Sequence, residues 1–373
     1  YELDFATFKD KYSDCLVKNV CPKPKEKIYQ EINERIMMSY LQSINGEIKK
    51  YFEVLEPTFP VWLDRYIETK QMQRLKFIST SCGTIYSKLY SDRVFYSTLD
   101  HSVAVALIIW HFTHDKRQTL AGLFHDIATP VFKHCIDFMK GDYTKQESTE
   151  SETHEMIAGS SEIMKYLKED GISLSEVEDY KIYPIADNDK PKLSADRLEY
   201  SLSDGYFRYG LLNFEQVKRI YQDIEIEINE QNFPEVGFKT KKIAREFVKA
   251  TSEMSIIYRE DRTRYSMLLL AEISKRLCQD GLLKIEDLYS IKESEVIDII
   301  KKSRYNEIFS IWENATKVKT SKDRPTGVYS VKINSKVRYI NPLVNGERIY
   351  DICKLAKRMI DKNLAYDMSN YVY

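Results

Sequence analysis

Apolar residues recur along most of this chain at intervals of three and four positions, the spacing that places them on one face of an α-helix. The densest stretch, residues 99–112, is apolar at almost every position and predicts a buried helix. Residues 117–128 predict a second buried helix, which ends near Pro130. Further helical patterns cover residues 64–77, 154–168, 194–207 and much of 240–303. We therefore expect a mostly α-helical protein.

The two ends of the chain are expected to form separate parts. Residues 26–55 place apolar positions at helical spacing, and prolines follow at positions 57 and 60. Near the other end, apolar and polar residues alternate on both sides of Asn334-Ser335, which predicts a β-hairpin, and a last helix is expected from Arg348 to Lys362. The expected parts are an N-terminal helical segment (1–60), a larger helical domain (61–320) and a small C-terminal α+β extension (321–373).

The composition narrows the class of protein. Hydrophobic residues make up 43% and charged residues 30% of the 373 positions, which is typical of a globular chain, and 12 glycines and 10 prolines are few for a turn-rich sheet protein. The formal net charge of −1 gives no overall basic field, so nucleic acid is not an expected partner. No apolar run is as long as a membrane span, the polar start does not resemble a signal peptide, and the six cysteines form no CxxC pair. We expect a cytoplasmic protein with no membrane partner.

All six histidines lie between His101 and His154. His101 falls in the first turn of one buried helix, His125-Asp126 at the end of the next, and Asp196 on a later helix. Leaving a buried imidazole and carboxylate unpaired is costly, so a metal or a complete hydrogen-bond network must satisfy them. Mixed nitrogen and oxygen donors suit a divalent transition metal: Mn, Fe, Ni or Zn, with Mg as an additional candidate. Such a metal acidifies water and neutralises charge on a phosphoryl group.

Three segments, LDHSVAVAL, AGLFHDIATPVFKH and LSADRLEYSLSD, resemble the three motifs of the HD-domain phosphohydrolases. Within that superfamily they look closest to the deoxynucleoside triphosphate triphosphohydrolase branch. That branch continues its second motif as HD-(I/L)-G-x-x-P-F-x-H, and here His125-Asp126-Ile127 leads to Phe132 and His134. Glu68-Thr69 and Gln73-Arg74-Leu75 also resemble its upstream helix. The resemblance covers roughly residues 60–270 and implies a helical HD-domain fold.

The resemblance also implies roles for particular residues. The implied metal ligands are His101, His125, Asp126 and Asp196. His154, aided by Glu155, would be a proton donor near the scissile phosphate, and His134 would contact phosphate. Arg197 would hold a phosphate, Tyr200 and Asp204 a sugar, and these three share one helical face. Thr129 is a further candidate substrate contact, at a position that is often His in this branch.

Several departures from the branch leave its substrate open. Besides Thr129, Thr98-Leu99-Asp100 precedes His101 without the usual upstream Arg, and Thr80 and Ser81 replace residues that help to recognise deoxyribose. The leading hypothesis is a metal-dependent hydrolase of a nucleotide phosphoester, with a deoxynucleoside triphosphate, a monophosphate and a cyclic nucleotide as candidate substrates. Related enzymes are dimers or larger, so we expect a homo-oligomer.

Two other functions remain as alternatives. One is a nucleotide-binding regulatory HD protein with little or no turnover. The other is a di-iron oxygenase, which would require His154 as a ligand of a second metal.

Four further expectations concern two segments and two sets of arginines. Residues 140–154 predict a polar loop that is long enough to cover a site, and Pro234 and Gly237 predict a break between helices. Arg197 has an alternative role in an ordinary ion pair with Glu199 or Asp204. Arg259, Arg262 and Arg264 are expected to form a solvated helix face, with a second phosphate contact as the alternative.

Overall fold

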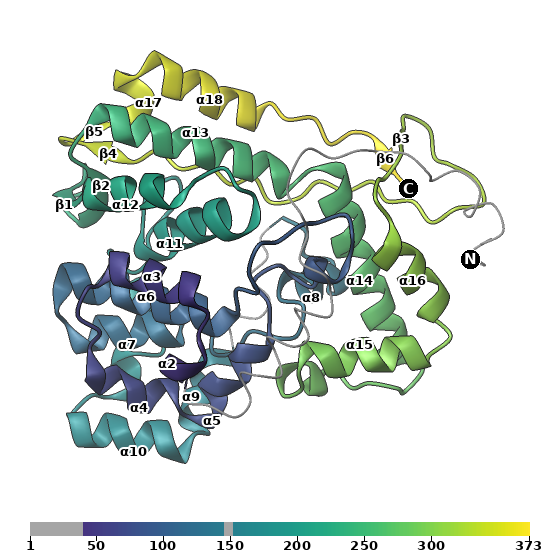
Figure 1. Cartoon of the computed structure of the whole chain (residues 1–373), viewed down its shortest axis with the longest axis horizontal. Coiled ribbons are helices and arrows are strands. Elements are labelled where there is room, and N and C mark those ends of the chain that lie inside the picture. The colour runs from purple at the N-terminus through teal and green to yellow at the C-terminus, as the bar shows by residue number, and fades with distance from the viewer. Residues whose placement is uncertain (1–39, 145–151) are drawn as a thin grey trace.

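A computed structural model gives the structure of the protein and describes residues 40–144 and 152–373. Helices dominate these residues, so the predicted mostly α-helical fold with a small C-terminal α+β part is confirmed (Figure 1). The first part of the expected N-terminal helix, residues 26–39, and the middle of the expected loop, residues 145–151, lie outside the described part. No helix among the described residues is both long and apolar enough to cross a membrane.

Two neighbouring helices form the centre of the larger hydrophobic core. They are α6 (Thr98–Thr113) and α7 (Lys116–Phe124), the two buried helices that the sequence predicts. The start of α6 is set by a capping box, in which Ser97 accepts from the amide of Asp100 and Asp100 accepts from the amide of Ser97. Gly122 lets α7 approach closely, because a Cβ there would overlap the Ile109 side chain. The close approach fixes the end of α7, and with it His125, beside the first turn of α6.

Other helices pack around this pair. On one face, α6 contacts α3 (Gly46–Leu55) and α11 (Ala195–Ser203), and α11 continues as a π-helical turn from Asp204 to Arg208. The expected helix over residues 64–77 is interrupted, and consists of α4 (Asp64–Ile67), α5 (Lys70–Arg74) and short 3-10 turns. The expected helix over residues 154–168 is two helices, α9 (Thr153–Ala158) and α10 (Ser161–Asp170), because Ser160 caps the second. The short helix α2 (Tyr40–Ser43) precedes α3.

A second hydrophobic cluster lies on the other side of the molecule (Figure 1). It is built by α8 (His134–Met139), α14 (Asp261–Gln279), α15 (Glu293–Lys302) and α16 (Asn306–Asn314). Trp312 is buried within it and donates to the Ser266 hydroxyl. The long helical region that the sequence predicts after residue 240 is therefore divided between two cores, since α13 (Lys241–Ile257) packs in the first.

A small sheet joins distant parts of the chain. Its order is β1 (Ile224–Ile228), β2 (Pro234–Phe238), β4 (Leu343–Val344) and β5 (Glu347–Arg348), with β2 and β4 parallel. The break between helices expected at Pro234 and Gly237 is confirmed, because no helix runs through these residues and both belong to β2. Proline is tolerated there because it is the first residue of its strand. The helices α12 (Phe214–Gln222), α17 (Ile349–Ile352) and α18 (Lys354–Leu364) flank this region.

The C-terminal hairpin across Asn334-Ser335 is not formed. In the described chain residues 332–342 belong to no strand, and Val331 pairs instead with Val372. The ladder nearby joins β3 (Thr320–Ser321) to β6 (Tyr371–Val372). After β3 the chain crosses the molecule to β4 (Figure 1). The alternating pattern therefore reflects an extended segment packed between other elements, not a pair of strands.

Candidate metal centre and its cavity

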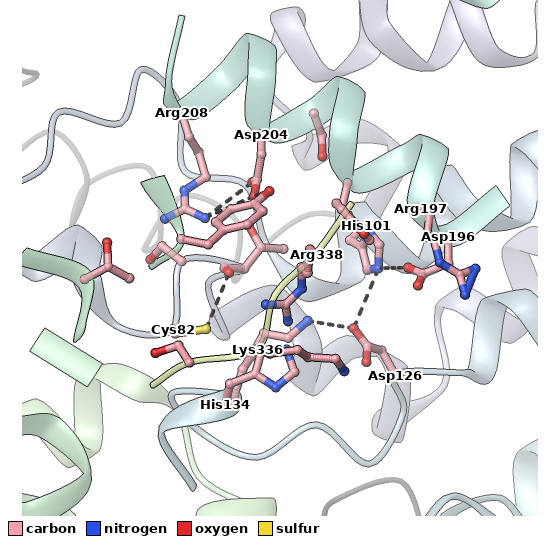
Figure 2. A pocket seen from close by; sticks show the side chains of 18 of the residues that line it. Cys82, His101, Asp126, His134, Asp196, Arg197, Asp204, Arg208, Lys336 and Arg338 are labelled. Atoms are coloured by element: carbon pink, nitrogen blue, oxygen red, sulfur yellow. Dashed lines mark hydrogen bonds and ion pairs between the residues drawn. The ribbon is translucent and has the colours of Figure 1, made fainter. Parts of the chain in front are cut away.

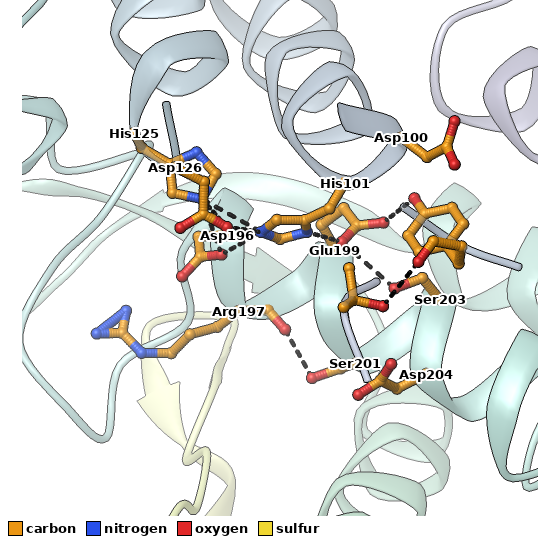
Figure 3. A network of polar contacts seen from close by, with 12 residues as sticks. Asp100, His101, His125, Asp126, Asp196, Arg197, Glu199, Ser201, Ser203 and Asp204 are labelled. Carbon is orange, nitrogen blue, oxygen red and sulfur yellow. Dashed lines mark hydrogen bonds and ion pairs between the residues drawn. The ribbon is translucent and has the colours of Figure 1, made fainter. Parts of the chain in front are cut away.

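Four side chains from three segments converge at the end of α7. The Nε2 atoms of His101 and His125 lie 3.2 Å apart, and an Asp196 oxygen lies 3.2 Å and 3.7 Å from them (Figure 3). An Asp126 oxygen lies 3.8 Å from each of the same two nitrogen atoms. The structure thus brings together all four residues that the resemblance implies as metal ligands.

Each imidazole is oriented by its other ring nitrogen. His125 Nδ1 donates to the carbonyl oxygen of Gly122 at 2.7 Å, and His101 Nδ1 is bonded to the Glu199 carboxylate. These bonds turn the two Nε2 atoms, the usual metal-binding atoms, toward each other. Two nitrogen lone pairs at 3.2 Å repel each other unless a cation or a proton lies between them. The donor set therefore fits a divalent metal.

The charges of the centre also favour a cation. Burial works against ionisation, but Lys133 and the two imidazoles hold the pKa of Asp126 well below its usual range. Burial also raises the pKa of Asp196, but contact with His101 outweighs it and brings the value to about 2. Burial alone would lower the pKa of His101, but the Glu199 and Asp196 carboxylates raise it to about 10. Both aspartates are anionic at neutral pH, so the site attracts positive charge, whether a proton or a metal.

Glu199 is a further residue of the candidate site, and the sequence motifs did not predict its contact with His101. Its side chain is fully buried behind His101 and accepts hydrogen bonds from the Tyr96 hydroxyl at 2.6 Å and from Tyr51 and Ser203 at 3.3 Å each (Figure 3). A buried carboxylate with these donors keeps the imidazole in one tautomer and one orientation. The spacing in the sequence could have indicated this contact, since Glu199 follows Asp196 by three residues and so lies on the same side of α11.

The turn after Asp126 has an unusual backbone. Phe132 and Lys133 have positive φ values of 62° and 44°, which residues other than glycine rarely adopt. The turn directs Lys133 Nζ to Asp126 at 2.7 Å and places His134 at the start of α8. Strain of this kind collects at functional sites, where the surrounding structure holds it in place.

The centre opens into a cavity of about 260 Å³. Of the predicted substrate residues, His134, Arg197, Tyr200 and Asp204 line this cavity (Figure 2). Thr129, His154 and Glu155 are not among the lining residues. His154 is exposed and bonded to Glu178, Glu155 is also exposed, and Thr129 is buried with its carbonyl oxygen accepting from Arg74. The structure therefore does not bring these three predicted residues to the metal centre.

His134 is held in one orientation at the cavity. Its Nδ1 atom bonds Asp137 at 2.8 Å, and Asp137 is fully buried. Burial lowers the pKa of His134 although the Asp137 carboxylate works in the opposite direction. The imidazole is therefore neutral at neutral pH, and its second nitrogen is able to exchange a proton.

Arg197 takes a different ion-pair partner from those expected. Its Nη1 atom donates to Asp187 and to the Ser194 hydroxyl, each at 2.8 Å, and its Nη2 atom is bonded to the Asn188 carbonyl oxygen. The expected alternative pairing with Glu199 or Asp204 is wrong. The guanidinium instead bonds the segment before α11 to the start of that helix, which fixes the position of the adjacent candidate ligand Asp196.

The far end of the cavity is a buried polar network. Asp204 accepts from the Tyr258 hydroxyl at 2.7 Å and pairs with Arg208 at 3.4 Å, and Arg208 also contacts Asp92 at 3.1 Å. Tyr200 lines the cavity as well, and burial raises its pKa to about 12. Arg208 and Tyr258 were missed, because the sequence gives no sign that a π-helical turn and α13 meet here.

Together these features define a helical protein in which two histidines and two aspartates form a candidate metal centre at one end of a polar cavity. No family model matches the chain. Two solved structures share the fold: a hypothetical protein from Aquifex aeolicus (TM-score 0.56, 16% identity, 84% of this chain and 92% of that one) and a phosphohydrolase from Bacteroides thetaiotaomicron (TM-score 0.51, 13% identity, 86% and 94%).

Two curated proteins are distant relatives by sequence. The uncharacterized protein YdhJ of Bacillus subtilis is 25% identical over 251 residues, which cover 67% of this chain and 74% of that protein. The metal-dependent phosphohydrolase cns2 of Cordyceps militaris is 25% identical over 167 residues, 42% of this chain and 44% of that protein.

Proposed function

We propose that the protein is a metal-dependent phosphohydrolase that cleaves a phosphoester of a nucleotide. The observation that carries the proposal is the convergence of His101, His125, Asp126 and Asp196 at one end of the cavity. The relatives named phosphohydrolases support the class of reaction. When bound, a divalent metal there would acidify a water molecule and offset charge on a phosphoryl oxygen.

The remaining chemistry falls to side chains near the centre. Lys133 is bonded to Asp126 and keeps this carboxylate anionic. Lys133 also adds a positive charge to the lining of the cavity, where the phosphate of a substrate would lie. His134 faces the same cavity with a lowered pKa, so its free ring nitrogen suits accepting a proton from an attacking water molecule, whereas the exposed His154 lies outside the cavity. Arg197 holds the segment before Asp196 in place through its bonds to Asp187 and Ser194, and it does not contact the phosphate directly.

The size and lining of the cavity support a single nucleotide as the substrate. A volume of about 260 Å³ is near the lower end of small-ligand pockets, which is roughly 300 Å³. Tyr90, Tyr200, Tyr209 and Tyr258 line it and offer aromatic faces and hydroxyls to a base or sugar. Asp204 would accept from a sugar hydroxyl at the end opposite the metal.

A phosphate-release screen tests this function. The full chain, loaded in turn with Mn, Fe, Ni, Zn or Mg, is incubated with nucleoside monophosphates, triphosphates and cyclic nucleotides. We expect metal-dependent release of phosphate or of a polyphosphate from at least one of them, and His134→Ala should lower kcat by about a hundredfold or more. Binding of nucleotides without any product would contradict the hydrolase and favour a regulatory protein.

A further inference from the structure

Arginine side chains that are withdrawn from water usually pair with a carboxylate, because an unpaired charge is costly away from solvent. Several arginines in the described part of the chain follow this rule. Examples are the pairs Arg197–Asp187, Arg208–Asp92 and Arg264–Asp261. An arginine without such a partner must be held in place by other contacts.

Two buried arginines correct an expectation and show what such a residue does in this chain. Arg259 and Arg264 are each 1% exposed, so the predicted solvated helix face is wrong. Arg264 donates to the carbonyl oxygen of Ile333 at 3.0 Å, and Arg259 donates to that of Asn363 at 2.7 Å. Each guanidinium thus holds the backbone of a segment that is distant in the sequence.

Arg74, the last residue of α5, has no carboxylate partner in the part of the chain that the structure describes. Its Nη1 atom is buried and makes no hydrogen bond with a described residue. Burial lowers the pKa of Arg74 to about 10, so the guanidinium stays charged at neutral pH. No ion pair offsets the cost of this charge, and the hydrogen bonds of the other nitrogen atom are the contacts that hold it.

That nitrogen atom, Nη2, bonds two backbone carbonyl oxygens of a single turn. It lies 2.7 Å from the oxygen of Thr129 and 3.1 Å from that of Ile127, and both residues are buried. The turn begins at Asp126, whose carbonyl oxygen accepts from the Thr129 amide at 2.9 Å. Hydrogen bonds from a charged donor are roughly twice as strong as neutral ones. Arg74 therefore fixes the backbone directly after a candidate metal ligand.

The same segment leads back to the candidate metal centre. Beyond Pro130 the backbone passes through the left-handed residues Phe132 and Lys133, and Lys133 Nζ lies 2.7 Å from Asp126. His134 follows and lines the cavity. A displacement of the first half of the segment would therefore move the Asp126 carboxylate and also the two side chains at its other end.

We propose that Arg74 is a positioning residue of the metal centre, which holds the turn after Asp126 so that this carboxylate reaches the metal. The proposal rests on the proposed metal centre and not on the identity of the substrate. Residues that hold a ligand in place typically contribute about 10–100-fold to metal affinity. Arg74 acts through the backbone after Asp126, whereas Glu199 acts through the imidazole of His101.

A matched pair of variants, Arg74→Lys and Arg74→Met, tests this role. Both side chains are unbranched and similar in length, but only lysine keeps the charge and N–H donors. Titration of the metal-free full chain with Mn or Zn should show about a tenfold or larger loss of affinity in Arg74→Met and a smaller loss in Arg74→Lys. The Tm of each metal-free variant measures folding separately. Arg74→Gln takes the place of Arg74→Met if the latter does not fold, and it should also lose more affinity than Arg74→Lys.

Cobalt(II) supplies a second readout, because its visible absorption spectrum depends on the number and arrangement of its ligands. The spectrum of cobalt-loaded Arg74→Met should differ from that of the unmodified chain, and Arg74→Lys should restore much of it. Arg65→Met is the matched control, since Arg65 pairs with Glu169 and Asp170 outside the cavity. It should leave both metal affinity and the cobalt spectrum unchanged, whatever its effect on Tm.

The results distinguish this proposal from the proposed function. Unchanged metal affinity in a folded Arg74→Met would overturn the positioning role, as would equal losses in Arg74→Lys and Arg74→Met, and either result would leave the hydrolase in place. Absence of metal binding by the unmodified chain would contradict the metal centre and the positioning role together. The expected changes in metal affinity without any release of phosphate would contradict the hydrolase alone.

Discussion

At the scale of single residues, the metal centre depends on which nitrogen of each imidazole is free. His101 and His125 each commit Nδ1 to the protein and leave Nε2 for a ligand. For His125 the partner is the backbone carbonyl of Gly122 in the preceding helix, so the local structure alone orients its imidazole. For His101 the partner is Glu199, which itself depends on hydroxyls from Tyr96, Tyr51 and Ser203. The orientation of His101 is therefore the more sensitive of the two to mutation.

Glu199→Gln should weaken metal binding while leaving the fold in place. The amide keeps the size of the side chain but loses the charge that orients and polarises His101, and such losses typically cost about 10–100-fold in metal affinity. Titration of the metal-free chain with Mn or Zn measures the effect. Glu215→Gln, in the first turn of α12 and away from the cavity, is the control. Unchanged affinity in Glu199→Gln would show that Glu199 does not position the ligand.

At the scale of elements, the site depends on where helices end. α7 ends immediately before His125, α8 begins at His134, and α11 begins one residue before Asp196. Side chains at these positions reach the cavity, whereas the middle of each helix is packed in a core. The turn between α7 and α8 also packs near the first turn of α15, where Glu293 is fully buried.

Burial raises the pKa of Glu293 to about 8. A carboxyl whose pKa is higher in the folded chain than in the unfolded chain contributes stability below the unfolded value of about 4.3. That contribution is lost as the pH rises through about 8. Its size is roughly 1.4 kcal/mol for each unit of pKa difference, so the total is on the order of a few kcal/mol.

Glu293→Gln should therefore remove part of the pH dependence of stability. Between about pH 5 and pH 9 the Tm of the unmodified chain should fall more than that of the variant. Thermal unfolding followed by circular dichroism at several pH values checks this. A variant whose Tm falls as steeply as that of the unmodified chain would show that another group titrates.

At the scale of the whole molecule, the sequence predicted what periodicity and motif spacing determine. The buried helices α6 and α7 lie where the apolar pattern placed them, and the four metal-binding candidates meet although they are spread over residues 101–196. The β1–β2 hairpin and the position of Lys336 and Arg338 in the lining of the cavity were not predicted. The position of these two residues depends on contacts between segments far apart in the chain, and a local sequence pattern does not predict such contacts. The exposure of His154 and the partners of Arg197 were likewise decided by tertiary packing.

The central claim is that His101, His125, Asp126 and Asp196 hold a metal on which hydrolysis depends. Elemental analysis of the unmodified chain, Asp126→Ala and His134→Ala, each paired with phosphate release, tests it most directly. The account predicts about one divalent metal ion per chain in the unmodified protein and in His134→Ala, with activity strongly reduced in the latter. Asp126→Ala should keep its helicity but lose both metal and hydrolysis. A full equivalent of metal in Asp126→Ala, or undiminished hydrolysis by the unmodified chain after chelation, would contradict the account.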